Sequence, residues 1–207
     1  MAELMKWLND WLGFFKPLQV RNLQIFWSGQ AAALIGMWLQ VTAMGILVYD
    51  ISGGSATAVG FLAALNALPF FLGGMLLAGL GDRFDRRKLL IAVQCVQWLV
   101  AVALFLLTML DMLQLWHLYA AGLVMGVNQT VGFPTQQAFV GDLIPRRQLQ
   151  EAVGMYSLVF NTCRAVGPAL AGYIIAEWGA GTAFGGNVVA SLPLIGCLVA
   201  LKGRVAD

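Results

Sequence analysis

Positions 82–88 bring charges of both signs together in one short segment. The segment contains two acids and four bases: Asp82, Arg83, Asp85, Arg86, Arg87 and Lys88. A carboxylate in such a segment can cap the first turn of a helix or accept hydrogen bonds from a guanidinium. The segment is therefore a candidate for ion pairing and helix capping.

A second set of candidates consists of polar side chains inside long apolar runs. Buried polar groups in a membrane interior are costly and mark functional sites by default. The candidates for such a site are Gln40, Asn128, Gln129, Gln136, Asn161 and Arg164, with Gln30 and Gln137 beside them. The alternative role for the amides is hydrogen bonding between helices.

Arg164 is the sharpest of these candidates. An arginine at the centre of a membrane helix costs about 2.5–3.5 kcal/mol on insertion scales. It must therefore face water, a partner or a ligand, and no Asp or Glu stands in the middle of an apolar run to neutralise it. The open choices are a backbone group, an amide such as Asn161, an anionic substrate group or a residue outside this chain. We expect Arg164 to belong to a functional site.

Residue patterns typical of enzymes are absent from the sequence. Ser55 lies between two apolar runs and His117, the only histidine, lies at the end of another, so a buried Ser–His pair is not expected. Cys95, Cys163 and Cys197 have no metal-binding or disulfide spacing. The sequence also contains no phosphate-binding G-x4-G-K-S/T loop. We expect neither enzymatic activity nor a cofactor or metal.

The composition indicates a membrane protein. The chain has 207 residues, of which 60% are hydrophobic and only 11% charged, and its mean hydropathy is +0.79. A typical soluble domain carries roughly 25% charged residues. This composition excludes an ordinary cytosolic domain, a disordered chain and a nucleic-acid-binding protein, and it makes the lipid bilayer the expected surroundings.

Six apolar stretches are long enough to cross a bilayer, which takes about 20 residues each. They lie at roughly 22–48, 56–80, 88–110, 115–140, 150–176 and 180–201. The connections between them are too short for a further domain. We therefore predict an all-α membrane protein in which residues 19–207 form one six-helix bundle.

The basic residues predict the orientation of this bundle. Of the 12 Lys and Arg residues, all but Arg164 fall before the first stretch, in the second and fourth connections or after the sixth stretch. The other three connections carry only acids: Asp50, Asp111 and Glu177. The positive-inside rule then places both termini in the cytoplasm.

Residues 1–18 form a separate amphipathic segment. Leu4, Trp7, Leu8 and Trp11 recur at helical spacing with charged residues between them, and Pro17 ends the run. The segment has no continuous apolar core of the signal-peptide type. We expect a short helix lying in the membrane interface.

The charged segment resembles a signature of the major facilitator superfamily, G-x-x-x-D-R/K-x-G-R/K-R/K, between the second and third helices. Asp82, Arg83, Arg86, Arg87 and Lys88 fall on it, while Ala78 and Asp85 replace its two glycines. The form D-R-F-D-R-R is similar to the branch of enterobactin exporters and macrolide efflux proteins. The resemblance implies a cytoplasmic latch between two six-helix halves, with Asp82 as its carboxylate.

A second resemblance lies on the predicted fifth span. Antiporter-type members of the superfamily carry G-x8-G-x3-G-P-x2-G-G there, and Gly154, Gly167, Pro168 and Gly172 match it. Cys163 and Ala171 replace the other two glycines. Small residues permit close helix approach and proline bends a helix. The resemblance implies a bend associated with export.

The two halves of the chain share a short sequence pattern. The second and fifth stretches both contain Pro-x-x-x-Gly, at 69–73 and 168–172, on helices that run in opposite directions. Transporters are often built from inverted repeats of this kind. We therefore expect two inverted three-helix repeats, equivalent to the N-terminal half of a major-facilitator fold.

These observations converge on transport. The resemblance implies alternating access and secondary active efflux of a small amphiphilic compound, such as a siderophore, an antibiotic or another drug, across the bacterial inner membrane. In such a carrier the polar side chains named above, with Arg164, are expected to line the substrate cavity. The expected partner is a second six-helix half, either a C-terminal half, a separate chain or a second copy. The alternatives are a membrane module that does not transport and an uptake carrier of the same superfamily.

Overall fold

The computed structural model describes residues 21–78, 84–143 and 149–200. These ranges contain six helices and no strand: α2 Arg21–Ile51, α3 Ala56–Ala78, α5 Arg86–Met109, α6 Leu115–Leu143, α7 Leu149–Trp178 and α8 Ala180–Ala200. Every stretch predicted to cross the membrane is thus helical. The predicted interfacial segment 1–18 and the residues Asp82 and Arg83 lie outside the described residues.

Five of the helices are long and apolar enough to cross a membrane: α2, α3, α5, α7 and α8. Helix α6 is 29 residues long but is not among them. Its amides, Asn128, Gln129, Gln136 and Gln137, lower its hydropathy, because each polar side chain opposes transfer into hydrocarbon. All six helices are therefore long enough to be the six predicted spans, and five of them are also apolar enough.

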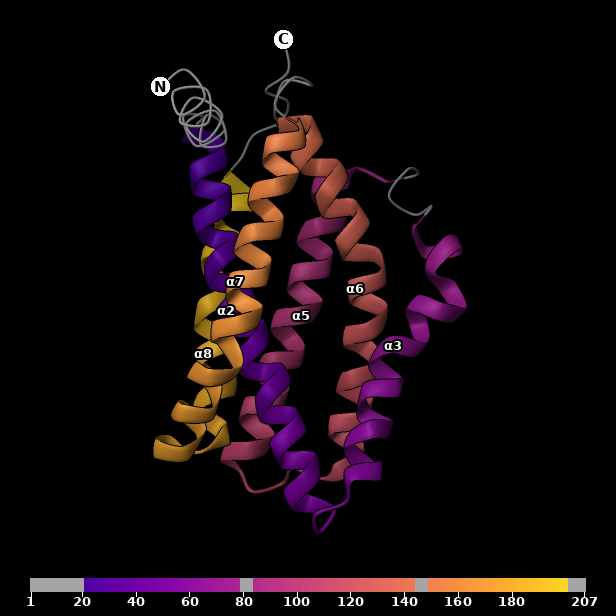
Figure 1. The fold of residues 1–207 in the computed structure, drawn as a ribbon, viewed down its shortest axis with the longest axis vertical. Coiled ribbons are helices and arrows are strands. Elements are labelled where there is room, and N and C mark those ends of the chain that lie inside the picture. Colours follow the sequence, from indigo (N-terminus) through magenta and orange to yellow (C-terminus); the bar gives the residue numbers. More distant parts are fainter. Residues whose placement is uncertain (1–20, 79–83, 144–148, 201–207) are drawn as a thin grey trace, which may run out of the picture.

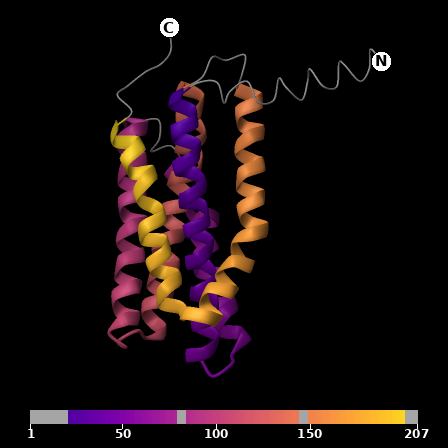
Figure 2. The same cartoon turned by 90° about the vertical axis from the view of Figure 1, so that its left-hand side faces the viewer.

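The helices run alternately up and down and form one elongated bundle (Figures 1 and 2). Helix α2 packs mainly against α8 and α7, and α6 packs mainly against α3 and α5. Helices α5 and α8 pack against each other and join these two groups. We call the end at which α2 begins and α8 ends the basic end, since Arg86, Arg87 and Lys88 lie there.

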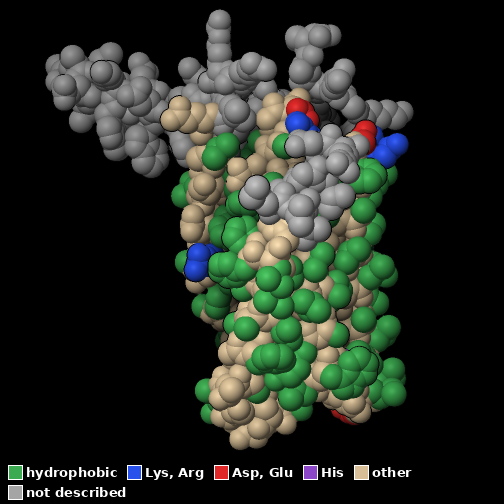
Figure 3. All heavy atoms as spheres, turned by 90° about the vertical axis from the view of Figure 1, so that its right-hand side faces the viewer, with side chains coloured by type: hydrophobic (Ala, Val, Ile, Leu, Met, Phe, Trp, Pro, Cys, Tyr) green, Lys and Arg blue, Asp and Glu red, His purple; other side chains and the backbone are tan. Residues whose placement is uncertain are grey.

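Hydrophobic side chains cover the long sides of the bundle on the face shown in Figure 3. On that face Lys, Arg, Asp and Glu groups lie at the basic end, an acidic group lies at the opposite end, and one Lys or Arg group lies at mid-height. An apolar belt with charged ends is the surface expected of a protein surrounded by lipid. The chain is thus a multi-pass membrane protein.

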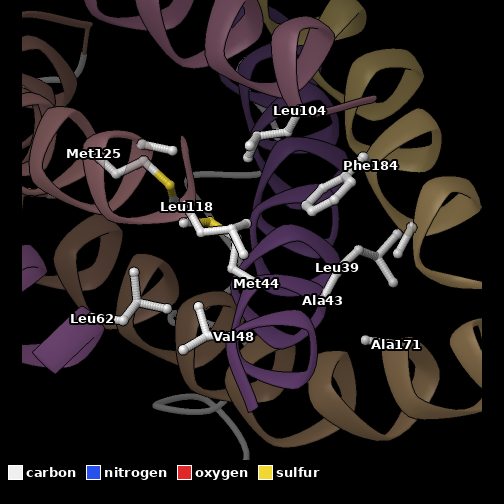
Figure 4. Packing of buried hydrophobic residues seen from close by; sticks show 12 residues of the cluster. Leu39, Ala43, Met44, Val48, Leu62, Leu104, Leu118, Met125, Ala171 and Phe184 are labelled. Carbon is white, nitrogen blue, oxygen red and sulfur yellow. The ribbon is translucent and has the colours of Figure 1, made fainter. Parts of the chain in front are cut away.

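Two clusters of buried side chains fill the bundle. Near the basic end, Phe26, Trp27, Phe139 and Tyr156 bring the rings of α2, α6 and α7 together. Towards the other end, α2 supplies the centre of a larger cluster, seen in Figure 4. Its labelled members are Leu39, Ala43, Met44, Val48, Leu62, Leu104, Leu118, Met125, Ala171 and Phe184. Both clusters are anchored on α2, which makes this helix the core of the fold.

Glycine allows close approach at the main helix contacts. A Cβ at Gly126 of α6 would overlap the backbone carbonyl of Asn66 in α3. A Cβ at Gly36 of α2 would overlap the side-chain oxygen of Asn187 in α8. Small residues at such contacts drive helix association in membranes, where lipid is as apolar as the side chains.

The turn between α7 and α8 consists of Gly179 alone. Its φ is +82°, a left-handed conformation that glycine adopts without steric cost. The reversal brings α8 back alongside α2 (Figure 2). The outer part of α7 also changes direction in this view, and Pro168 lies within the C-terminal half of that helix.

Candidate functional site

An ion pair joins α5 to α6 at the basic end. Nη1 of Arg86 donates to both carboxylate oxygens of Asp142, at 2.9 and 3.0 Å, and lies 3.5 Å from the carbonyl oxygen of Ala138. The two side chains are 37% and 51% exposed. Exposed pairs of this kind contribute about 0.2–1 kcal/mol. The pair therefore matters more for the relative position of the two helix ends than for the stability of the fold.

Arg87 ties the same end of α5 to the end of α8. Its Nε donates to the carbonyl oxygen of Leu198 and its Nη2 to that of Val199, each at 2.7 Å. The last carbonyls of a helix have no partner within the helix. The guanidinium fork thus closes the C-terminus of α8 with two hydrogen bonds.

Asp85 is the N-cap of α5. Its Oδ1 accepts a hydrogen bond from the backbone N–H of Lys88 at 3.0 Å. This role accounts for an acid at a position where the signature has glycine, since a carboxylate satisfies a free N–H of the first turn. Asp85, Arg86 and Arg87 therefore fix three helix ends at one point.

Gln40 is completely enclosed between α2, α6 and α8. It has no exposed surface, and its side-chain oxygen accepts a hydrogen bond of 2.5 Å from Nδ2 of Asn187. Its Nε2 donates to Sδ of Met125 at 3.1 Å, and Ser191 donates to Asn187 Oδ1 at 3.1 Å. In this structure Gln40 joins helices and does not face an open cavity.

Asn187 and Ser191 are not among the residues that the sequence predicts to be functional. Both are buried, with 1% and 2% of their surfaces exposed. Asn187 follows Gly185 and Gly186 within the most C-terminal apolar run. An amide next to small residues in an apolar run indicates an interhelical hydrogen bond, so this pattern could have identified Asn187.

Asn128 is likewise used between helices. Its Nδ2 donates to the carbonyl oxygen of Val93 at 2.9 Å and lies 3.4 Å from Oε1 of Gln97, both on α5. Asn128 is thus directed towards α5, on a different side of α6 from Gln129. Of the six predicted cavity residues, Gln40 and Asn128 bond between helices in this conformation.

The other four predicted cavity residues lie along α6 and α7. A small pocket between these helices is lined by Gln136, Gln137, Val140, Val153 and Tyr156. Gln136 is 9% exposed, and its Nε2 has no hydrogen-bond partner among the described residues. The pocket therefore combines apolar walls with an unused hydrogen-bond donor.

Both helices also carry exposed side chains outside this pocket. On α6, Gln129, Phe133 and Gln137 recur every four residues and are all exposed. On α7, Asn161 and Arg164 are exposed, and Asn161 Nδ2 donates to the carbonyl oxygen of Ser157 at 2.7 Å. We call the pocket and these exposed side chains together the α6/α7 groove. Its polar members from the predicted cavity are Gln129, Gln136, Asn161 and Arg164.

The residues of the predicted bend have different surroundings. A Cβ at Gly167 would overlap the Cβ of Trp38 on α2, so this glycine is required for contact between α7 and α2. A Cβ at Gly172 would meet nothing within 4 Å. Cys163, which replaces a signature glycine, lies on the same buried face as Gly167, near the carbonyl oxygen of Ala31. Gly154 and Pro168 lie within the continuous helix α7.

His117 lies at the opposite end of the bundle from the charged segment. Its Nδ1 accepts a hydrogen bond from the backbone N–H of Gln114 at 3.0 Å, and its ring lies 3.8 Å from that of Trp116. These contacts give the histidine a role in starting α6. Among the described residues, no group of three or more His, Cys, Asp or Glu side chains is placed to hold a metal ion.

Comparison with known proteins identifies the family of this helical membrane bundle. A model of the transmembrane secretion effector family matches residues 12–207, nearly the whole chain. The chain belongs to this family, which is part of the major facilitator superfamily. Members of the superfamily are transporters rather than enzymes.

Three relatives illustrate the range of the family. The staphyloferrin A transporter of Staphylococcus aureus is 26% identical over 77% of this chain, and macrolide efflux protein A of Streptococcus pyogenes is 23% identical over 84%. An enterobactin exporter of Citrobacter koseri is 24% identical over 79% of the chain. The matches cover 40%, 41% and 42% of these relatives, so the chain corresponds to less than half of each. No solved structure matches the chain.

Proposed function

We propose that this chain forms one half of a secondary active exporter, which moves a small amphiphilic compound out of a bacterial cell by alternating access. The observation that carries the proposal is the α6/α7 groove, whose exposed amides and arginine lie on helices of a largely apolar bundle. Polar residues in such an interior face a substrate path by default. The names of the relatives support export of siderophores or antibiotics as the substrate range.

The groove supplies the substrate contacts in this proposal. Gln129, Gln136, Asn161 and Arg164 line the cavity, and Phe133 and Tyr156 offer ring faces beside them. Gln40 and Asn128 do not contact the substrate in this proposal. They fix the helices that form the cavity wall, through hydrogen bonds to α8 and α5.

The basic end acts as the cytoplasmic latch. Asp85, Arg86 and Arg87 hold the ends of α5, α6 and α8 together, so that this end moves as one unit. Asp82 and Arg83 would then meet the second six-helix half, and Lys88 would contribute positive charge. The bacterial inner membrane, with the basic end in the cytoplasm, follows from the positive-inside rule.

An inverted repeat fits the pattern of helix neighbours. Helix α2 lies against α7 and α8, while α6 lies against α3 and α5. Exchanging α2, α3 and α5 for α6, α7 and α8 maps these neighbours onto each other and leaves the α5–α8 contact in place. This pattern supports two three-helix units related by a pseudo-two-fold axis. In that arrangement, Pro69 and Pro168 occupy equivalent positions.

Alternating access can be tested by chemical labelling of single cysteines. In a chain whose Cys95, Cys163 and Cys197 are replaced by alanine, we would compare Gln129→Cys with Val127→Cys. Both positions are exposed on α6, and they lie two residues apart on opposite sides of the helix. A charged, membrane-impermeant maleimide is added to intact cells and, separately, to inverted membrane vesicles.

We expect the thiol at position 129 to react from both sides of the membrane, because a carrier opens its cavity to each side in turn. The thiol at position 127 should react from neither side, since lipid surrounds it. A non-transporting module would leave both thiols equally unreactive, and this result would contradict the proposal.

A further inference from the structure

The charges of the described helices are distributed unevenly along the membrane normal. Asp50, Asp111 and Glu177 lie at one end of the bundle, and Asp85 and Asp142 lie at the other. Arg164 lies in the middle third of α7, is exposed and forms no ion pair with a described residue. The mid-depth charge contributed by these helices is therefore positive.

Unused hydrogen-bond donors accompany this charge. Among the described residues, the buried side-chain atoms without a hydrogen-bond partner are Trp27 Nε1, Trp38 Nε1, Gln136 Nε2 and the acceptor Gln30 Oε1. Three of the four are N–H donors. Each unsatisfied buried group costs about 1–3 kcal/mol, so a stable fold usually retains one only where something else satisfies it.

The three donors follow α7. The ring of Trp27 lies 5.8 Å from that of Tyr156, the ring of Trp38 lies 6.4 Å from that of Phe160, and Gln136 shares the pocket with Tyr156. The three donors thus belong to side chains of α2 and α6 that lie beside Tyr156 or Phe160 of α7.

Arg164 stands on the same side of α7 as this pocket. Val153 lines the pocket, and Arg164 follows it by eleven residues, or about three turns and roughly 16 Å of helix. Eleven residues bring the helix back to nearly the same direction. Along this side of α7, Tyr156 and Phe160 lie in sequence between Val153 and Arg164, and the ring of Phe133 lies 6.0 Å from that of Tyr156.

We propose that the α6/α7 groove selects an amphiphilic anion, with its carboxylate or similar acidic group on Arg164 and a neutral acceptor on the Gln136 amide. This inference rests on the proposed function and names its substrate class. Charge-assisted hydrogen bonds from arginine to carboxylate are about twice as strong as neutral ones. A cationic substrate would instead meet Arg164 without an acid in the described helices to balance it.

Binding of a matched pair of probes tests this inference. Dansyl-leucine carries a carboxylate, and dansyl-leucinamide is its neutral counterpart of nearly the same shape. The protein, expressed in its natural reading frame and reconstituted in lipid nanodiscs, is titrated with each probe. Energy transfer from tryptophan to dansyl, corrected by competition with acetyl-leucine or acetyl-leucinamide, reports binding to the protein.

The wild-type protein should bind the carboxylate about tenfold more tightly than the amide, the effect of one charge-assisted contact. Arg164→Gln should bring the two affinities to within about twofold of each other, and Arg164→Lys should retain part of the preference. Gln136→Leu should weaken both probes equally, because its amide recognises no charge. Lys88→Gln, which removes an exposed cation at the basic end, should leave the preference unchanged.

Two results would overturn the inference. Equal binding of the two probes by the wild type would show that Arg164 pairs with an acid elsewhere in the transporter or faces water. A preference that survives in folded Arg164→Gln would place the anion at another group. In either case, the cysteine labelling at position 129 tests the proposed transport function independently of this inference.

Discussion

Gly126→Ala is expected to lower the free energy of unfolding by about 1–3 kcal/mol, the usual effect of overfilling a packed contact. The new Cβ would overlap the carbonyl oxygen of Asn66 and lie 2.9 Å from its carbonyl carbon. Both are backbone atoms, so no side-chain rotation can relieve the overlap. Helix α3 would have to move away from α6, which also breaks the bond from Asn66 Nδ2 to the Gly122 carbonyl at 3.2 Å.

The matched control for this variant is Gly60→Ala. Gly60 lies in α3, and a Cβ there would meet nothing within 4 Å. Both variants make the same glycine-to-alanine change within a helix, so their difference isolates the packing contact. Thermal unfolding in detergent, followed by intrinsic fluorescence, would measure it. Equal stability of the two variants would show that α3 and α6 are not packed as described.

The second large effect concerns the buried amides. Gln40→Leu keeps most of the side-chain volume but leaves Asn187 Nδ2 without its acceptor in a fully buried position. An unsatisfied buried amide costs about 1–3 kcal/mol. The same loss is expected when Asn187→Ala leaves Gln40 Oε1 unpaired, and Gln137→Leu, which alters an exposed amide, should change stability by no more than about 0.5 kcal/mol.

A double-mutant cycle separates the hydrogen bond from the packing around it. If the bond links the two amides, Gln40→Leu combined with Asn187→Ala should cost clearly less than the sum of the single losses. The stabilities would be measured by unfolding in detergent, as for Gly126→Ala. Strict additivity would mean that the two side chains act independently, contrary to the structure.

The sequence contained enough information to predict the helices. Apolar runs separated by short connections gave bounds within about three residues of those observed, because membrane helices must satisfy their own backbone groups over a fixed thickness. The same reasoning could not show that Arg86 pairs with Asp142 or that Arg87 closes α8. Arg86 and Asp142 are 56 residues apart in the sequence, and Arg87 and Leu198 are 111 residues apart. Both contacts therefore depend on how the helices pack.

The cavity was harder to predict than the helices. Helical periodicity places Gln129 and Gln137 on one side of α6 and Asn128 on another, but it does not indicate which side meets a neighbouring helix. The structure resolves this: Asn128 bonds to α5, and Gln129 is exposed on the side of the groove. Gln40 was predicted to line the cavity only because it is an amide in an apolar run. Its hydrogen bond to Asn187 depends on the packing of α2 against α8, which the sequence does not show.

Transport itself is the central claim, and uptake into inverted membrane vesicles measures it most directly. The chain is expressed in its natural reading frame in a host that lacks its own drug exporters, and the vesicles are energised by respiration. They are offered dansyl-leucine, dansyl-leucinamide and the cation ethidium in turn. We predict energy-dependent accumulation of dansyl-leucine above that in vesicles without the chain. If none of the three compounds accumulates although the protein is folded in the membrane, the proposed exporter function is wrong.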